Sequence, residues 1–180
     1  MISKTLVKLV DEAILPAVVL VSAKLLSGIL VTEALGLKWT WQDFGMSFHS
    51  PGDFLKDNSY SALVMFGIIL VFTIWVLFKS HVFHDSHISP SVSVKVLSLN
   101  LPRLIQSSFE LYSQATVWLS YSWLTTAMLG VSAFSNLIYP WVFYVALGLS
   151  LLTSVAMIID IEREVVINHE DFLEPSNSYA

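Results

Sequence analysis

Long stretches without any charged residue alternate along the chain with shorter polar segments. Residues 58–78 contain no charge, and residues 111–159 contain neither a charge nor a histidine. Because about 20 residues of helix cross a hydrocarbon core of ~30 Å, the second stretch is long enough for two crossings. Together with an apolar segment near the N-terminus, this pattern predicts an all-α integral membrane protein, a bundle of four transmembrane helices in one domain. The predicted spans are residues 13–35, 58–78, 111–131 and 139–161.

Turn-forming residues divide the longer stretch into two predicted spans. Ser135 and Asn136 favour a turn, and Pro140 is suited to the first turn of a helix. The break is therefore expected between Ser132 and Pro140.

The polar segments predict which side of the membrane each part faces. An outer loop is expected at 36–57, an inner segment at 79–110 and an acidic tail at 162–180. With both termini cytoplasmic, the inner side carries six Lys or Arg residues and the outer side two, as the positive-inside rule requires. The inner cations are Lys4, Lys8, Lys79, Lys95, Arg103 and Arg163, and the outer ones are Lys38 and Lys56.

Both connecting segments contain local signals. In the outer loop, Trp39 and Trp41 favour a position along the membrane interface, and Ser50-Pro51-Gly52-Asp53 indicates a turn. In the inner segment, residues 91–96 alternate with a period of two, which is typical of an extended strand. A short helix that begins at Pro90 and lies on the membrane is the alternative.

Composition narrows the classes of function. The chain is 55% hydrophobic and 13% charged, with a net charge of −5, so it lacks the basic surface that nucleic-acid binding needs. It has no cysteine, which excludes disulfides, thiolate metal sites and cysteine nucleophiles. We find no phosphate-binding loop, dinucleotide fingerprint or nucleophile elbow, and we expect no cofactor.

A few ionisable or polar residues fall within or beside the predicted spans. Lys24 lies near the middle of the first span, where a charge is costly and usually faces other helices or a water-filled cavity. Its partner is expected to be an oxygen atom of another helix, with Gln114 favoured by depth and Glu110 by charge. Glu33 is a further intramembrane acidic residue, and it or Glu110 could mark the entrance of a transport path.

Small residues at helical spacing mark a packing face on the first span. Gly28, Thr32 and Gly36 recur every four residues and would allow a second helix to approach closely. Lys24 lies on this same face.

A histidine-rich segment follows the second span. His81, His84 and Asp85 are spaced by three and four residues, so a continuing helix would place them on one face with ligands suited to a divalent metal. Solvated side chains are the simpler interpretation, and no metal is expected.

These observations favour a non-enzymatic, multi-pass protein of the cell membrane. We expect it to scaffold or pack within a larger membrane complex or a homo-oligomer, with lipid and other membrane subunits or copies of itself as partners. The alternative is a small transporter or channel that uses Lys24 with Glu33 or Glu110. A membrane enzyme with a metal site in the inner histidine segment is the second alternative.

Overall fold

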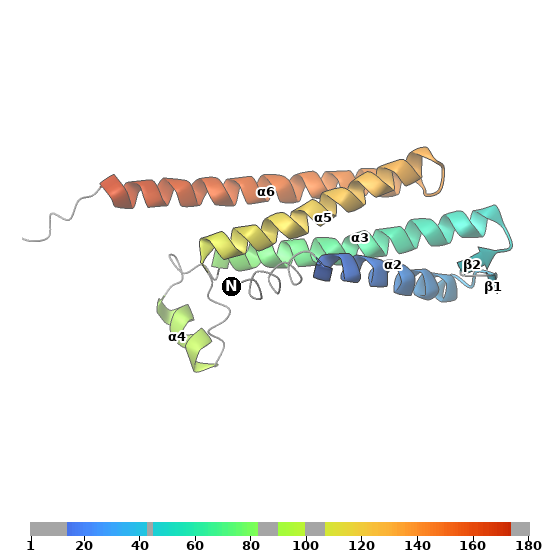
Figure 1. The fold of residues 1–180 in the computed structure, drawn as a ribbon, viewed down its shortest axis with the longest axis horizontal. Helices are drawn as coiled ribbons and strands as arrows, with labels where there is room; N and C mark the ends of the chain where they lie inside the picture. Colours follow the sequence, from blue (N-terminus) through green and yellow to red (C-terminus); the bar gives the residue numbers. More distant parts are fainter. Residues whose placement is uncertain (1–13, 43–44, 83–89, 100–106, 174–180) are drawn as a thin grey trace, which may run out of the picture.

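The computed structural model describes residues 14–42, 45–82, 90–99 and 107–173, and it is mostly helical (Figure 1). Four long helices, one short helix and a two-stranded hairpin make up these residues. In chain order they are α2 (Leu15–Ala34), β1 (Trp39–Gln42), β2 (Gly45–Phe48), α3 (Pro51–Val82), α4 (Pro90–Ser98), α5 (Ser108–Phe134) and α6 (Pro140–Leu173).

Three of the described helices are long and apolar enough to cross a membrane: Leu15–Ala34, Pro51–His81 and Pro140–Arg163. They coincide with the spans predicted at 13–35, 58–78 and 139–161 and indicate a membrane protein. The fourth long helix, α5, covers the span predicted at 111–131, but its many serines and threonines leave it outside this group.

Helix α3 begins earlier than the sequence indicates. The predicted outer loop at 36–57 therefore includes its first turns. The backbone N–H of Asp53 donates to Ser50 Oγ at 3.1 Å, so the expected turn at Ser50 is the N-cap of the helix. Pro51 fits the first helical position because its missing N–H would have no partner inside the helix.

The rest of the predicted outer loop is more regular than expected. Strands β1 and β2 pair antiparallel, with Trp39 opposite Phe48 and Trp41 opposite Met46. The rings of Trp39 and Trp41 meet edge to face, with their centroids 5.7 Å apart. In the inner segment, α4 confirms the helical alternative that begins at Pro90.

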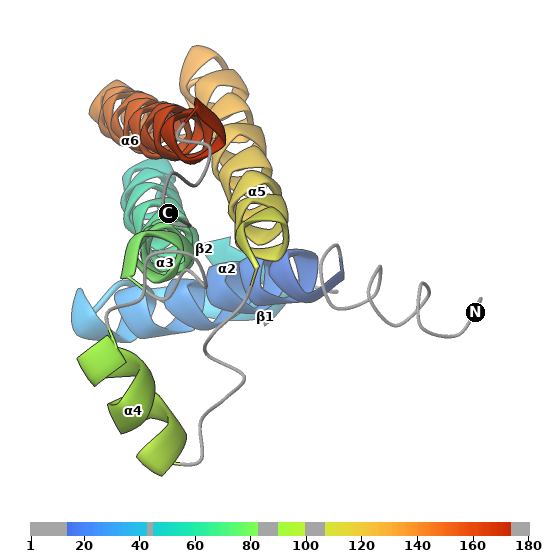
Figure 2. The ribbon, with the colours of Figure 1, turned by 90° about the vertical axis from the view of Figure 1, so that its left-hand side faces the viewer.

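Helix α3 is the central element. It packs against α2, α5 and α6, and α5 also packs against α6. In Figure 2, α3 and α6 are seen largely along their axes, whereas α2 lies across the view. The hairpin and the turn between α5 and α6 are at one end of the bundle, and α4 is near the other (Figure 1).

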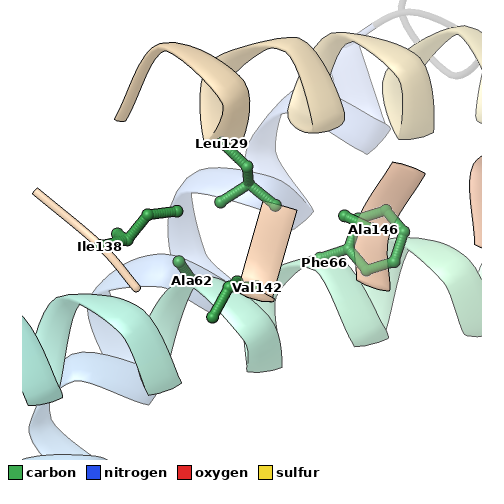
Figure 3. Packing of buried hydrophobic residues seen from close by; sticks show 6 residues of the cluster. All are labelled: Ala62, Phe66, Leu129, Ile138, Val142 and Ala146. Carbon is green, nitrogen blue, oxygen red and sulfur yellow. The ribbon is translucent and has the colours of Figure 1, made fainter. Parts of the chain in front are cut away.

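The main apolar cluster joins three helices at the hairpin end (Figure 3). Ala62 and Phe66 of α3 meet Leu129 of α5 and Val142 of α6, and all four are buried. Gly130 permits a close approach here, since a Cβ on this residue would lie 3.1 Å from the Phe143 ring.

The distribution of polarity differs from that of a soluble protein. The described residues include twelve buried polar or charged side chains beside fourteen buried hydrophobic ones. Large hydrophobic side chains are exposed along all four long helices, for example Leu30, Val71, Val131 and Leu152. Such continuous apolar surface is unusual for a soluble monomer and suits lipid contact.

Two helices end in the same way. Gly36 after α2 and Asn136 after α5 have left-handed backbones, with φ of 60° and 57°. In each turn the next residue's N–H donates back into the helix, from Leu37 to the Thr32 carbonyl oxygen at 3.0 Å and from Leu137 to that of Ser132 at 2.8 Å. The break expected between Ser132 and Pro140 is thus confirmed.

The backbone of Gly36 gives a direct test of this helix end. We expect Gly36→Ala to lower the free energy of unfolding by about 1 to 2 kcal/mol, because a left-handed conformation is costly with a Cβ. Unfolding by a denaturing detergent in mixed micelles, followed by circular dichroism, measures the change.

Gly148→Ala is the matched control, since both glycines have open space around the added Cβ but only Gly36 has a positive φ. It should be neutral or stabilise by up to about 1 kcal/mol. Equal losses for the two variants would contradict the assignment of Gly36 as a helix cap.

Candidate functional site

The most concentrated group of polar contacts in the described residues lies between α2 and the first part of α3. The Lys24 ammonium group donates to Asn58 Oδ1 at 2.8 Å, to the Asn58 carbonyl oxygen at 3.3 Å and to Ser61 Oγ. Ser27, one turn further along α2, donates from its hydroxyl to the Ser61 carbonyl oxygen at 3.0 Å. The cation is therefore directed into the interface between two helices.

A carboxylate completes this group. Thr32 Oγ1 lies 2.9 Å from Asp57 Oδ1 and 2.7 Å from the Gly28 carbonyl oxygen, both of which accept hydrogen bonds. Asp57 is buried and interacts electrostatically with Lys24. A positive and a negative side chain thus share one interface.

The contacts continue to the turn between α5 and α6. Asn58 Nδ2 donates to the Leu137 carbonyl oxygen at 2.8 Å, and the Tyr139 N–H donates to Ser59 Oγ at 2.8 Å. Because Asn58 also accepts from Lys24, one side chain connects α2, α3 and this turn. We call Lys24, Ser27, Thr32, Asp57, Asn58 and Ser61 the α2–α3 polar cluster.

Helical spacing explains how the sequence builds the cluster. Lys24, Ser27 and Thr32 lie on one face of α2, separated by three and five residues, and Asn58 and Ser61 are three apart on α3. The face on α2 is predictable from the sequence. The groups on α3 are not part of that prediction, because Asp57 falls in the predicted outer loop and the predicted span begins at Asn58. The spacing of Asn58 and Ser61 is nevertheless a usable signal.

The predicted partners of Lys24 are replaced by others. An oxygen-bearing group of another helix does face the ammonium, but Asn58 and Ser61 provide it in place of Glu110 and Gln114. Glu110 is exposed and interacts electrostatically with Lys79 at the other end of the bundle, and Gln114 is half-buried on α5. This difference arises because α2 packs mainly on α3.

The remaining predicted residues separate into two groups. Gly28 and Thr32 are buried beside Asp57, as a packing face requires. Gly36 is exposed beyond the end of α2, where it caps the helix and does not pack against another one. Glu33 is exposed in the last turn of α2.

A second polar group lies at the opposite end of α3. Asp160 of α6 accepts from Ser80 Oγ at 3.1 Å and from the Tyr112 hydroxyl at 3.2 Å, and its other oxygen is 2.9 Å from His81 Nδ1. The carboxylate therefore joins α3, α5 and α6. The sequence offered only a lone acidic residue at the end of an apolar stretch, which does not identify these partners.

The structure tests only part of the predicted metal site. His81 lies in the last turn of α3, whereas His84 and Asp85 are outside the described residues. Among the residues that are described, no three His, Asp or Glu side chains are grouped to hold a metal.

Hydroxyl groups also join α5 and α6. The Ser150 hydroxyl lies 3.1 Å from that of Ser122 and 2.8 Å from that of Thr126, and Trp123 Nε1 donates to Ser154 Oγ at 2.9 Å. Polar side chains on α5 thus connect helices.

Comparison with known protein families, with curated proteins and with solved structures gives no match.

The cluster predicts how Lys24 contributes to stability. We expect Lys24→Met to lower the free energy of unfolding by about 1 to 3 kcal/mol, because it leaves Asp57 and the oxygens of Asn58 and Ser61 without their cation. Adding Asp57→Leu should recover most of this loss, since the buried charge is then removed as well. Detergent unfolding of the two single variants and the double variant measures the coupling.

Leu25→Met is the control, because Leu25 is exposed on the same helix and the change introduces the same side chain. It should leave stability unchanged. Purely additive effects of the Lys24 and Asp57 substitutions would contradict a coupled cluster.

Proposed function

We propose that the protein is a multi-pass membrane protein with four crossing helices and both termini on the cytoplasmic side. The distribution of polarity supports membrane insertion, since many large apolar side chains are exposed on the helices and polar ones are bonded between them. In lipid, unsatisfied polar groups are costly, so they are expected to be paired within the protein.

Helix α5 is included as the fourth crossing because most of its described hydroxyls have partners inside the protein. Thr116, Ser120, Thr125 and Ser132 each donate to the carbonyl oxygen four residues earlier, and Thr126 donates to that of Ser122. A hydroxyl bonded in this way exposes little polarity to lipid.

The charges support the orientation, and aromatic residues mark a membrane interface. Lys79, Lys95 and Arg163 are at one end of the described bundle, whereas Lys38 and Lys56 are at the hairpin end. Aromatic side chains gather at the hairpin end, where the Tyr60 and Trp141 rings lie 6.3 Å apart and Trp39 contacts Trp41. Membrane interfaces are enriched in such rings.

Within this membrane setting we infer a non-enzymatic subunit that scaffolds or packs within a larger complex or homo-oligomer. The observation that carries this inference is the position of Lys24, whose ammonium donates to Asn58 and Ser61 within a helix interface. Such bonding suits a structural role, and the exposed apolar faces of the helices leave surface for other membrane subunits.

A small transporter or channel is the second candidate, and the proximity of Lys24 and Asp57 favours it. Ionisable pairs inside membrane helices often line ion or proton paths. In that case, the charge of Lys24 would be needed for flux as well as for packing.

The topology predicts where single cysteines react in a chain that has none of its own. Thr40→Cys and Ser135→Cys should react with a membrane-impermeant maleimide from one side, and Ser98→Cys from the other, because α3 and α5 would each cross the membrane. Permeabilised membranes are the control, in which all three should react. Labelling of all three from one side would contradict four crossings.

A scaffolding subunit should assemble with other chains and should not transport ions. In mild detergent and after cross-linking in native membranes, we expect species larger than one chain of 20.1 kDa. Proteoliposomes should show no ion flux above protein-free liposomes, for wild type and Lys24→Met alike. A flux that Lys24→Met abolishes would establish the transporter, and a strictly single chain in both assays would remove the support for a scaffold.

A further inference from the structure

An apolar groove of about 560 Å³ lies between α3 and α6. These two helices lie side by side (Figure 2). Ile74 and Phe78 line it from α3, and Leu152, Ala156 and Ile159 line it from α6. On α6 the lining extends from Leu152 to Arg163, and the eleven helical steps between these residues correspond to ~16 Å. This length is close to half of a hydrocarbon core of ~30 Å, which is the depth that one leaflet provides.

The ionisable side chains of the groove lie at one end. His81, Asp160 and Arg163 are found there, at the end of the bundle that also carries Lys79. Thr153 at the other end of the groove is bonded to the carbonyl oxygens of Leu149 and Ser150. Asp160 accepts from Ser80 and Tyr112 and contacts His81 Nδ1, so its two oxygens are already bonded within the protein. The His81 ring is held by this contact, and its side chain is 62% exposed. Arg163 is exposed beside it.

We propose that this groove binds one anionic phospholipid, with an acyl chain along the apolar wall and the phosphate at Arg163 and His81. The proposal rests on the membrane insertion proposed above. Its basis is charge complementarity. The apolar acyl chain of a phospholipid matches the apolar wall that begins at Leu152, and its anionic phosphate matches the cation Arg163 at the end of the groove. Arginine also forms bidentate hydrogen bonds with phosphate oxygens.

Lipid retained by the full-length chain in mild detergent tests this site. Native mass spectrometry should show about tenfold stronger retention of phosphatidylglycerol than of phosphatidylcholine with the same acyl chains, because the choline cation offsets the phosphate charge that Arg163 would otherwise meet alone. Arg163→Gln should remove the preference. Lys38→Gln, at the opposite end of the bundle, is the charge control and should keep it.

The apolar wall is tested separately. Ala156→Phe would fill the groove and should lower the retention of both lipids by about tenfold, whereas Ala127→Phe on exposed α5 surface should not. Equal retention by the two variants, or a preference that survives Arg163→Gln, would overturn the site. Alkaline carbonate extraction distinguishes a failure of the lipid site from a failure of the proposed membrane insertion. If it releases the wild type from membranes, membrane insertion itself is wrong.

Discussion

The need to satisfy polar groups inside the protein is the constraint on which the structure depends. A helix that crosses lipid gains no hydrogen bonds from its surroundings, so its polar side chains must bond to other helices or to its own backbone. Helix α3 meets this constraint at both ends. Near its start, Asn58 and Ser61 receive Lys24 of α2, and near its end Ser80 and His81 meet Asp160 of α6. The apolar cluster around Phe66 lies between these two polar groups.

In this arrangement, the polar contacts align the helices along one another more than they add to the free energy of unfolding. Hydrogen bonds between membrane helices average only about 0.6 kcal/mol, and apolar side chains tolerate sliding of one helix along another. A bond such as that from Asn58 Nδ2 to the Leu137 carbonyl oxygen tolerates only a few tenths of an ångström in length, so it restricts the axial position of α3 against the α5–α6 turn. At the other end of α3, the contacts of Asp160 restrict the positions of α3, α5 and α6 in the same way.

The features that the sequence predicted are local ones. Charge-free stretches locate the helices, Asn136 and Pro140 locate a turn, and the spacing of Lys24, Gly28 and Thr32 identifies a packing face. The partner of Lys24 was not predictable in this way, because it depends on which helix lies next to α2 and at what inclination. Since α2 lies across α3, the middle of α2 meets the beginning of α3, and depth counted along the sequence misplaced Lys24. The hairpin was missed because its strands have only four residues each, too few for a clear pattern.

Helix α5 shows why average hydropathy is an incomplete guide. A hydropathy scale counts each serine or threonine as a group that needs water, but Thr125 donates to the Tyr121 carbonyl oxygen and Ser122 lies against Ser150. These hydroxyls are already bonded, so placing them in lipid would cost little further hydrogen bonding. The outward side chains in the second half of the same helix, among them Leu124, Met128 and Val131, are apolar, and the exposed Thr116 and Ser120 are bonded to its backbone. What a membrane would contact is therefore set by the direction of each side chain, and by that criterion α5 resembles the three more apolar helices.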